Sequence, residues 1–471
     1  MDCKEDNINS NRRDFLKKLG LGYIATAAAL TGCDKSSNNE NSASKEVPVG
    51  RMTYRINHNS GDKVSILGYG CMRWPTINSP EGEGKIIDQE TVNELVDYAM
   101  AHGVNYYDTA PPYCQGMSEK ATGIALKRHP RKSYYIATKL SNHRMAGQGW
   151  TPKKMFEESV KMYRNSFKEL QTDYIDYYLL HIVGIGQGLA STMERFIDCK
   201  IVDFLVKERE AGRIRNLGFS YHGDIKSFDY LLSRHDDYHW DFVQIQLNYV
   251  DYRHASGINF NADYLYEELA KRDIPVVVME PLLGVRLAGL TDYLNSRLKQ
   301  RRPEDSIASW AFRFAGSFPK VLTVLSGMTY KEHLQDNIRT YSPLVECTED
   351  EFALLEDTAQ TILKYPSVPC TACQYCMPCP YGLDIPAIFS HYNKCINEGF
   401  ITNSTQDENY AKARKAFLVG YDRKVPKLRQ ANHCIGCNHC VSHCPQTINI
   451  PAQMRRINDY VERLKADKHC G

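Results

Sequence analysis

Short apolar strands alternate with amphipathic helices from about residue 51 to residue 339, and this alternation constrains the fold more than any other feature of the 471-residue chain. Several of the apolar runs are nearly continuous, which is typical of parallel strands that helices cover. We count eight strand–helix units. Their strands are predicted near Ser65–Leu67, Val104–Asp108, Tyr134–Lys139, Tyr174–His181, Ile214–Ser220, Phe242–Gln246, Val276–Met279 and Val321–Leu325.

The starts of the helices fit the same alternation. Asp88 and the pair Thr151-Pro152 are typical helix-start residues, and Thr348 and Glu351 have the spacing of a capping box. The Arg51–Ile56 and Val64–Leu67 segments predict a hairpin ahead of the first unit. No G-x-G-x-x-G joins a strand to a helix, which argues against a dinucleotide-binding doubly wound sheet. The expected class is therefore α/β, with a (β/α)8 TIM barrel over residues 51–345.

Polar residues end three consecutive predicted strands. Asp108, Lys139 and His181 each follow an apolar run, and Tyr113 lies in the loop after Asp108. Barrels of this type carry their catalytic groups at the C-terminal ends of strands. A strand-terminal Asp is usually a cap and a loop Tyr usually packs, but the four together predict a proton-relay site. We expect Lys139 to lower the pKa of Tyr113, so that the phenol can serve as a general acid or base.

The stretch from Tyr107 to Tyr113, Tyr-Asp-Thr-Ala-Pro-Pro-Tyr, followed by Gly116, Ser118-Glu119 and Gly123, resembles the signature region of the aldo-keto reductase family. This resemblance covers residues 51–340. It implies that the catalytic tetrad is Asp108, Tyr113, Lys139 and His181, and that the reaction interconverts a small-molecule carbonyl and an alcohol with NADP or NAD. The implied nicotinamide and adenosine contacts are Ser220, Gln246, Ser326, Gly327, Met328 and Asn337.

The sequence departs from the family pattern around the cofactor. Neither Gly327 nor Met328 supplies a cation for a 2′-phosphate, and the nearest candidate is Lys331. NADP and NAD therefore both stay open. Glu280 stands where many members have Tyr or Ser, and a carboxylate there would favour the oxidised nicotinamide. The alternative is a structural ion pair between Glu280 and Arg286.

Eight of the 16 cysteines fall in two tight runs, which are Cys370, Cys373, Cys376 and Cys379, and then Cys434, Cys437, Cys440 and Cys444. The second run has the C-x2-C-x2-C-x3-C-P spacing of bacterial ferredoxins, whose last Cys binds the other cluster. We therefore assign one [4Fe–4S] cluster to Cys370, Cys373, Cys376 and Cys444. The other cluster is assigned to Cys434, Cys437, Cys440 and Cys379. Zinc and disulfides are the alternatives, and the spacing fits both less well.

The residues between the two runs predict helices over 385–397 and 408–419. We expect a connecting helix in 346–369 and a small, mainly α-helical, ferredoxin-like domain over 370–471. Such a tail on this barrel resembles an iron–sulfur-bearing subgroup of the family. The sequence Ile448-Asn449-Ile450-Pro451 also mirrors Leu383-Asp384-Ile385-Pro386.

The N-terminus predicts export. Arg12-Arg13 precede an apolar stretch of about 12 residues that ends in Leu-Thr-Gly-Cys33. Residues 1–33 resemble a twin-arginine signal with a lipobox, and residues 34–50 predict a flexible linker. The expected location is periplasmic, or membrane-anchored through a lipid at Cys33. A frayed basic helix in a cytoplasmic protein is the alternative.

The net charge is +2, and the basic residues are spread along the chain without a cluster. We therefore expect no nucleic-acid partner. The leading function is an NAD(P)-linked oxidoreductase that passes electrons through two clusters, with a redox partner protein. Two alternatives remain: an electron-transfer protein that uses the barrel as a scaffold, and a barrel enzyme with purely structural clusters. Export conflicts with the cytoplasmic supply of NAD(P)H unless the nucleotide is bound before export or electrons come from a partner.

Overall fold

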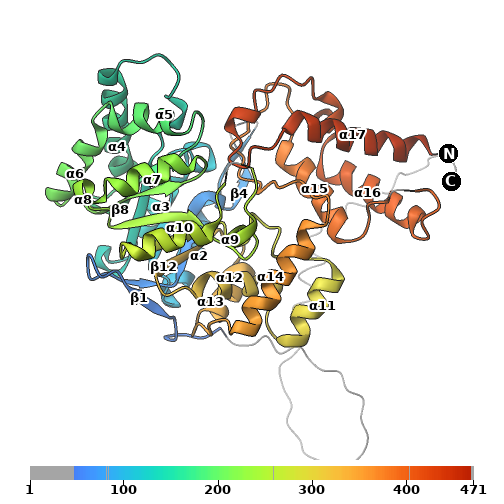
Figure 1. Cartoon of the computed structure of the whole chain (residues 1–471), viewed down its shortest axis with the longest axis horizontal. Coiled ribbons are helices and arrows are strands. Elements are labelled where there is room, and N and C mark those ends of the chain that lie inside the picture. Colours follow the sequence, from blue (N-terminus) through green and yellow to red (C-terminus); the bar gives the residue numbers. More distant parts are fainter. Residues whose placement is uncertain (1–46, 81, 83, 258, 403, 468–471) are drawn as a thin grey trace, which may run out of the picture. The chain divides into compact units, whose positions relative to one another are not determined.

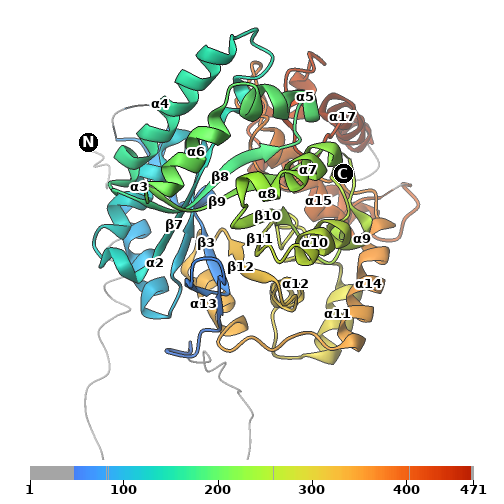
Figure 2. The ribbon, with the colours of Figure 1, turned by 60° about the vertical axis from the view of Figure 1, so that its left-hand side comes forward.

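Eight parallel strands form a closed barrel in the order β10-β11-β12-β3-β6-β7-β8-β9. All eight predicted units are confirmed, with helices around the strands (Figures 1 and 2). The barrel strands are β3 (Leu67–Gly70), β6 (Tyr106–Asp108), β7 (Tyr135–Leu140), β8 (Ile175–Val183), β9 (Ile214–Tyr221), β10 (Phe242–Gln246), β11 (Val276–Met279) and β12 (Val321–Ser326).

The computed structural model describes residues 47–467 except 81, 83, 258 and 403. The predicted signal, most of the predicted linker, Cys33 and the terminal Cys470 therefore lie outside the described residues. Within the described residues, no helix combines the length and the apolar character that a membrane crossing requires.

Two small antiparallel hairpins accompany the barrel. The first pairs β1 (Tyr54–Ile56) with β2 (Lys63–Ser65), as predicted. The second pairs β4 (Thr76–Asn78) with β5 (Lys85–Ile87) and was not predicted. The first barrel strand begins at Leu67, two residues later than we expected, because Ser65 pairs with Tyr54 in the first hairpin.

The helices of the barrel start where their caps predict. The Asp88 side chain accepts from Thr91 N, Thr151 accepts from Lys154 N, and the capping box of Thr348 and Glu351 is present. The helices of this part are α2 (Gln89–Ala101), α3 (Ser118–Leu126), α4 (Pro152–Leu170), α5 (Leu189–Thr192), α6 (Ile201–Glu210), α7 (Ile225–Ser233), α8 (His235–Tyr238), α9 (Asp251–His254), α10 (Ala262–Lys271), α11 (Asp292–Arg301), α12 (Ile307–Gly316), α13 (Lys331–Thr340) and α14 (Glu349–Leu363).

The barrel interior is packed at one end. Val64 of the first hairpin packs against inward-facing residues such as Tyr177 and Phe242. A second hydrophobic cluster lies between the strands and the surrounding helices and includes Leu355, Ala359 and Ile362 of α14. The connecting helix therefore belongs to the core of the barrel.

Residues 370–467, which we call the cysteine module, have a hydrophobic core of their own. Its helices are α15 (Ile385–Asn397), α16 (Tyr410–Lys424) and α17 (Ile450–Ala466). Asp384 caps α15 and Asn449 caps α17, each followed by Ile-Pro, so the repeated unit forms two equivalent helix starts. The cysteine runs lie just before these starts, in segments without α-helix or strand.

Candidate active site and cysteine cluster

The C-terminal ends of three adjacent strands bring the predicted proton-relay residues together. Asp108 ends β6, Lys139 lies in β7 and His181 in β8. The Lys139 ammonium donates to Asp108 Oδ1 at 2.6 Å and to the Thr109 carbonyl at 2.7 Å. Lys139 is fully buried and Asp108 nearly so, and burial lowers the pKa of the first and raises the pKa of the second, each against the pull of the other's charge.

Tyr113 begins a short 3-10 helix, Tyr113–Gly116, in the loop after β6. The Lys139 Nζ atom lies 4.9 Å from the centroid of its ring. The prediction that the pKa of Tyr113 lies below its usual value is wrong for this structure. Burial, then the nearby Tyr375 and Asp108, raise the pKa of Tyr113 well above its usual value. The Lys139 ammonium donates to Asp108 and Thr109. With its pKa raised, Tyr113 is a neutral phenol.

His181 stands at a bulge in β8, and Arg195 and Ser220 hold it there. The register of β8 and β9 shifts between Leu180 and Val183, and Ile182 has a positive φ of 53°. The buried guanidinium of Arg195 donates to the carbonyls of His181 and Ile182. Ser220 Oγ accepts from Ile182 N at 2.9 Å.

The imidazole of His181 is neutral. Burial, then the positive charge of Lys139, lower the pKa of His181 well below its usual value. Its Nδ1 lies 2.6 Å from Ser141 Oγ, and its Nε2 lies 3.4 Å from Tyr375 Oη. A Ser141 hydroxyl that donates to Nδ1 leaves the imidazole proton on Nε2, directed toward Tyr375.

A cavity of about 480 Å³, which we call the mouth cavity, opens beside these residues. Asp108, Tyr113 and His181 line it, whereas Lys139 lies behind Asp108. Four of the six predicted nucleotide contacts line it as well: Ser220, Ser326, Gly327 and Asn337. Asn337 Nδ2 donates to Ser326 Oγ at 2.9 Å, so this pair is already ordered.

The other two predicted contacts do not line the mouth cavity. Gln246 donates its amide to Asp251 Oδ2. Met328 is buried in the barrel core, and its carbonyl accepts from the Tyr69 hydroxyl at 2.5 Å. Gln244, one inward position earlier on β10, lines the cavity instead. Its buried Oε1 has no hydrogen-bond partner among the described residues.

Glu280 forms no ion pair with Arg286 in the described structure, so that alternative is wrong. Glu280 Oε2 accepts from Gly284 N at 2.5 Å, and burial raises the pKa of this carboxyl despite the nearby Arg73. Arg286 instead donates to Ser367 Oγ at 2.9 Å. The suggested phosphate ligand Lys331 does not line the mouth cavity, and its ammonium lies 4.8 Å from the Tyr98 ring centroid.

Sequence reasoning missed Tyr375, which the cysteine module inserts into the mouth of the barrel. Its hydroxyl is hydrogen-bonded to Tyr113 and lies near His181 Nε2. Arg73 also joins the two regions by donating to the Thr371 carbonyl at 2.8 Å. Only the position of Tyr375 between two predicted ligand cysteines could have drawn attention to it, since the contact is between residues far apart in the sequence.

The four cysteines of the first predicted cluster face one cavity. Cys370, Cys373, Cys376 and Cys444 line it together with apolar residues that include Ile385, Phe389 and Ile450. Burial, then the charges of Cys373, Cys370 and Cys444, raise the pKa of Cys376. The cysteine before Pro445 therefore lies with the first run, as the spacing predicts.

In the second predicted group, the charges of three other cysteines act on Cys440. Burial raises the pKa of Cys440 to about 11, with further contributions from Cys379, Cys434 and Cys437. All described cysteines are free, so no disulfide joins them. Among the described residues, no three His, Cys, Asp or Glu side chains are grouped closely enough to hold a single metal ion.

Comparisons with known proteins agree with the barrel. Residues 67–360 match the Aldo/keto reductase family. The uncharacterized oxidoreductase YqkF of Bacillus subtilis is 25% identical over 318 residues, which cover 64% of this chain and 95% of that protein. An aldo-keto reductase of Bacillus halodurans in its holo form is 24% identical, with a TM-score of 0.50 over 65% of this chain and 96% of that one. A Klebsiella pneumoniae aldo-keto reductase in complex with NADPH is 21% identical, with a TM-score of 0.49 over 65% of this chain and 96% of that one.

Proposed function

The chain belongs to the aldo/keto reductase family, and on that premise we propose that it is an NAD(P)-linked oxidoreductase that interconverts a small-molecule carbonyl and an alcohol. The observation that carries this proposal is the meeting of Asp108, Tyr113 and His181 at one cavity, with Lys139 held behind them. The proposal gives Tyr113 the role of general acid for reduction and general base for oxidation.

Each residue of the site has a separate task in this proposal. In reduction, the carbonyl carbon accepts a hydride, and Tyr113 gives the alkoxide oxygen its phenolic proton. His181 donates a hydrogen bond from Nε2 to the same oxygen as charge develops on it. Lys139, held by Asp108, keeps its positive charge 4.9 Å from the Tyr113 ring centroid and offsets part of the cost that burial adds to the phenolate that remains. Oxidation of the alcohol runs the same steps backwards.

The residues of the mouth cavity fit a nicotinamide nucleotide. When bound, the nucleotide supplies the hydride, and the oxidised nucleotide is the second product. The unpartnered Gln244 Oε1 suits the amide N–H of a carboxamide, and Ser220 adds a hydroxyl. Ser326 and Asn337 would hold the adenosine end. Glu332 and Asp336 line the same cavity, and so do Arg73 and His333. Because the lining carries charges of both signs, NAD and NADP stay equal candidates in this proposal.

We propose further that the cysteine module binds two [4Fe–4S] clusters. The crossed grouping of the cysteines and the apolar wall of the first cavity support this assignment. The clusters would supply one-electron transfer, and their thiolate ligands come from Cys370, Cys373, Cys376 and Cys444, and from Cys434, Cys437, Cys440 and Cys379. A redox partner protein would exchange electrons with them.

Export remains a proposal that rests on the sequence alone. A twin-arginine signal suits a protein that takes up its cofactors before it crosses the membrane, and Cys33 would carry the lipid anchor. Mass spectrometry of the N-terminal peptide from the native membrane fraction tests it. We expect a peptide that begins at a diacylated Cys33, and an unmodified N-terminus at Met1 or Asp2 would contradict the anchor.

Anaerobic purification with analysis of iron, sulfide and bound nucleotide tests the composite assignment. We expect about eight iron and about eight sulfide per chain from two four-iron clusters. Turnover of a simple aldehyde with NADH and with NADPH tests the barrel separately. Iron without turnover would favour the electron-transfer alternative, and turnover without iron would contradict the clusters.

A further inference from the structure

A second cavity, of about 600 Å³, lies between the barrel loops and the cysteine module. We call it the histidine cavity, because His143, His439 and His443 line it. The loop after β7 supplies His143 and Arg144, and the second cysteine run supplies the other two histidines. Tyr375 lines both this cavity and the mouth cavity, so its ring stands between them.

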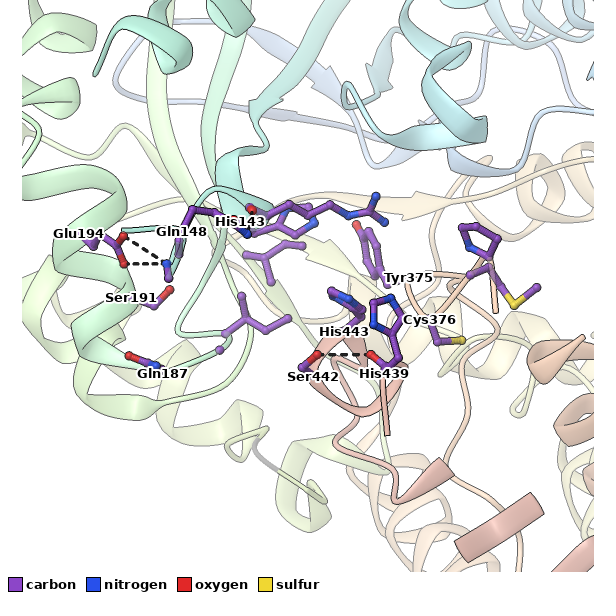
Figure 3. A pocket seen from close by; sticks show the side chains of 18 of the residues that line it. His143, Gln148, Gln187, Ser191, Glu194, Tyr375, Cys376, His439, Ser442 and His443 are labelled. Atoms are coloured by element: carbon purple, nitrogen blue, oxygen red, sulfur yellow. Dashed lines mark hydrogen bonds between the residues drawn. The ribbon is translucent and has the colours of Figure 1, made fainter. Parts of the chain in front are cut away.

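The histidine cavity has two sides that differ in their side chains. Figure 3 shows His143, Tyr375, His439 and His443 gathered on one side, whereas Glu194, Gln148, Gln187 and Ser191 lie on the other. Glu194 is the only acidic residue of the lining, and it accepts from Gly147 N at 3.1 and 3.2 Å. The histidine side therefore has no carboxylate within the lining.

On the histidine side, one ring nitrogen has no hydrogen-bond partner and one guanidinium has no carboxylate partner among the described residues. Arg144 forms no ion pair with any described residue, and it lines the cavity together with His143 and His443. His143 Nδ1 is buried, and it too has no partner among the described residues. Guanidinium and imidazole N–H groups are the donors that bind carboxylate and phosphate oxygens, and a neutral imidazole still donates one hydrogen bond.

We propose that the histidine cavity binds the anionic end of the carbonyl substrate, so that the enzyme acts on aldehydes or ketones that carry a carboxylate or phosphate. This inference rests on the proposed function. The polar side of the cavity, with Gln148, Gln187 and Ser191, suits hydroxyl groups of the same substrate. The carbonyl group then passes Tyr375 to reach Tyr113 and His181.

Kinetics with matched substrate pairs test the inference. We compare 4-oxobutanoate with butanal and D-glyceraldehyde 3-phosphate with D-glyceraldehyde, which separates carboxylate from phosphate. Wild-type enzyme should favour at least one anionic member by about tenfold or more in kcat/KM, the order expected for a charge-assisted contact. Arg144→Gln should reduce that ratio about tenfold. Arg164→Gln, an exposed arginine on α4 outside the lining, should leave the ratio unchanged.

Binding of succinate gives a readout that needs no turnover. Calorimetry should show that succinate binds wild type and Arg164→Gln, and binds Arg144→Gln about tenfold more weakly. Absence of succinate binding together with equal use of charged and neutral aldehydes overturns the inference and leaves the reductase proposal standing. Arg144-dependent binding without any turnover supports the anion site and contradicts the reductase proposal.

A third outcome addresses a competing role for the cations, which is to balance the charge of the clusters. If Arg144→Gln shifts the midpoint potential of the clusters but changes neither succinate binding nor the substrate ratio, the inference is overturned.

Discussion

The barrel mouth and the cysteine module both bury reactive side chains, but they hold them differently. At the barrel mouth, opposite charges pair directly, as in the 2.6 Å contact between Lys139 and Asp108. In the module, thiols face other thiols, and burial with neighbouring cysteines raises the pKa of Cys370 to about 11 and of Cys373 to about 12.

This difference indicates which of the two sites needs a bound group to be stable. Asp108, Lys139 and His181 lie in strands whose hydrogen bonds fix them, and Tyr113 lies in the loop after β6. We therefore expect this site to keep its geometry without a ligand. The cysteines lie in segments without α-helix or strand, and four ionised thiolates that face one cavity would repel one another. A bound group that carries metal cations would remove this repulsion, so we expect the module to depend on the proposed clusters and the barrel to be independent of them.

The largest effect should come from removing the phenolic hydroxyl of Tyr113. Tyr113→Phe should lower kcat for aldehyde reduction by about 10²–10⁴-fold, the usual contribution of a general acid. The iron content and visible absorption of the module should stay as in wild type, because the change touches only the barrel site. Tyr249→Phe, a buried barrel tyrosine outside the mouth cavity, is the control. A variant that retains full activity would remove Tyr113 from the mechanism.

Loss of one assigned ligand should weaken the module and spare the barrel. Cys444→Ser should lower the iron content by about half, from about eight to about four atoms per chain. Amide exchange should accelerate in α15, whose Ile385 and Phe389 line the four-cysteine cavity, and not in barrel strands. Cys395→Ser, a buried cysteine of α15 outside the assigned sets, should keep all the iron. Equal iron loss in both variants would contradict the assignment.

Arg195 tests how the barrel holds His181. Arg195→Gln should lower the free energy of unfolding of the barrel by about 3 kcal/mol, because it leaves buried carbonyls of His181 and Ile182 without donors. It should also reduce kcat/KM about tenfold as the imidazole shifts. Urea unfolding and steady-state kinetics measure both effects, with Arg164→Gln as control. A variant with wild-type stability and activity would show that the bulge at His181 does not depend on Arg195.

A buried carboxyl in the barrel should give a smaller, pH-dependent effect. Burial raises the pKa of Glu119 to about 6 from its ordinary 4.5, although Thr138 donates to it at 2.6 Å. The folded state therefore binds this proton more tightly, and the resulting stability is complete below pH 4.5 and lost as pH rises through 6. Glu119→Gln should be more stable than wild type by about 2 kcal/mol at pH 8 and nearly equal at pH 4. Urea unfolding at pH 8 and pH 4 measures the difference in free energy of unfolding between the variant and wild type. An equal difference at both pH values would contradict the raised pKa of Glu119.

Tyr375 should give the smallest effect, and it joins the two regions. Its hydroxyl contacts Tyr113 and lies 3.4 Å from His181 Nε2, the two donors that the proposed mechanism directs at the carbonyl oxygen. Tyr375→Phe should therefore remove a competitor. We expect KM for an aldehyde to fall about two- to tenfold, the size of one net hydrogen bond, with little change in kcat. Tyr381→Phe, an exposed tyrosine of the same module, is the control. A loss of kcat instead would give Tyr375 a direct part in the reaction.

Periodicity and capping predicted most of the barrel, because both depend on residues near one another in the chain. All eight strands and the caps at Asp88, Thr151 and Thr348 were found this way. The hairpin of β4 and β5 escaped, since two strands of three residues each carry no clear alternation.

The site was less predictable where contacts are distant in sequence. Spacing placed Cys444 with the first run, and the four side chains of that set line one cavity. The grouping of the second set stays a prediction. Gln244 lines the mouth cavity where we expected Gln246. The Gln246 amide instead donates to Asp251, a residue beyond the end of β10 that the strand pattern does not reveal. The insertion of Tyr375 beside His181 and the hold of Arg195 on the bulge arise only from tertiary packing.

The central claim is that the barrel moves a hydride to a carbonyl carbon while Tyr113 supplies the proton. Anaerobic incubation of the holoenzyme with NADH or NADPH deuterated at C4 and an aldehyde tests it by mass spectrometry of the alcohol. We predict one deuterium on the carbinol carbon with wild type and almost none with Tyr113→Phe. Oxidation of the nucleotide that leaves no deuterium in the alcohol would contradict the claim.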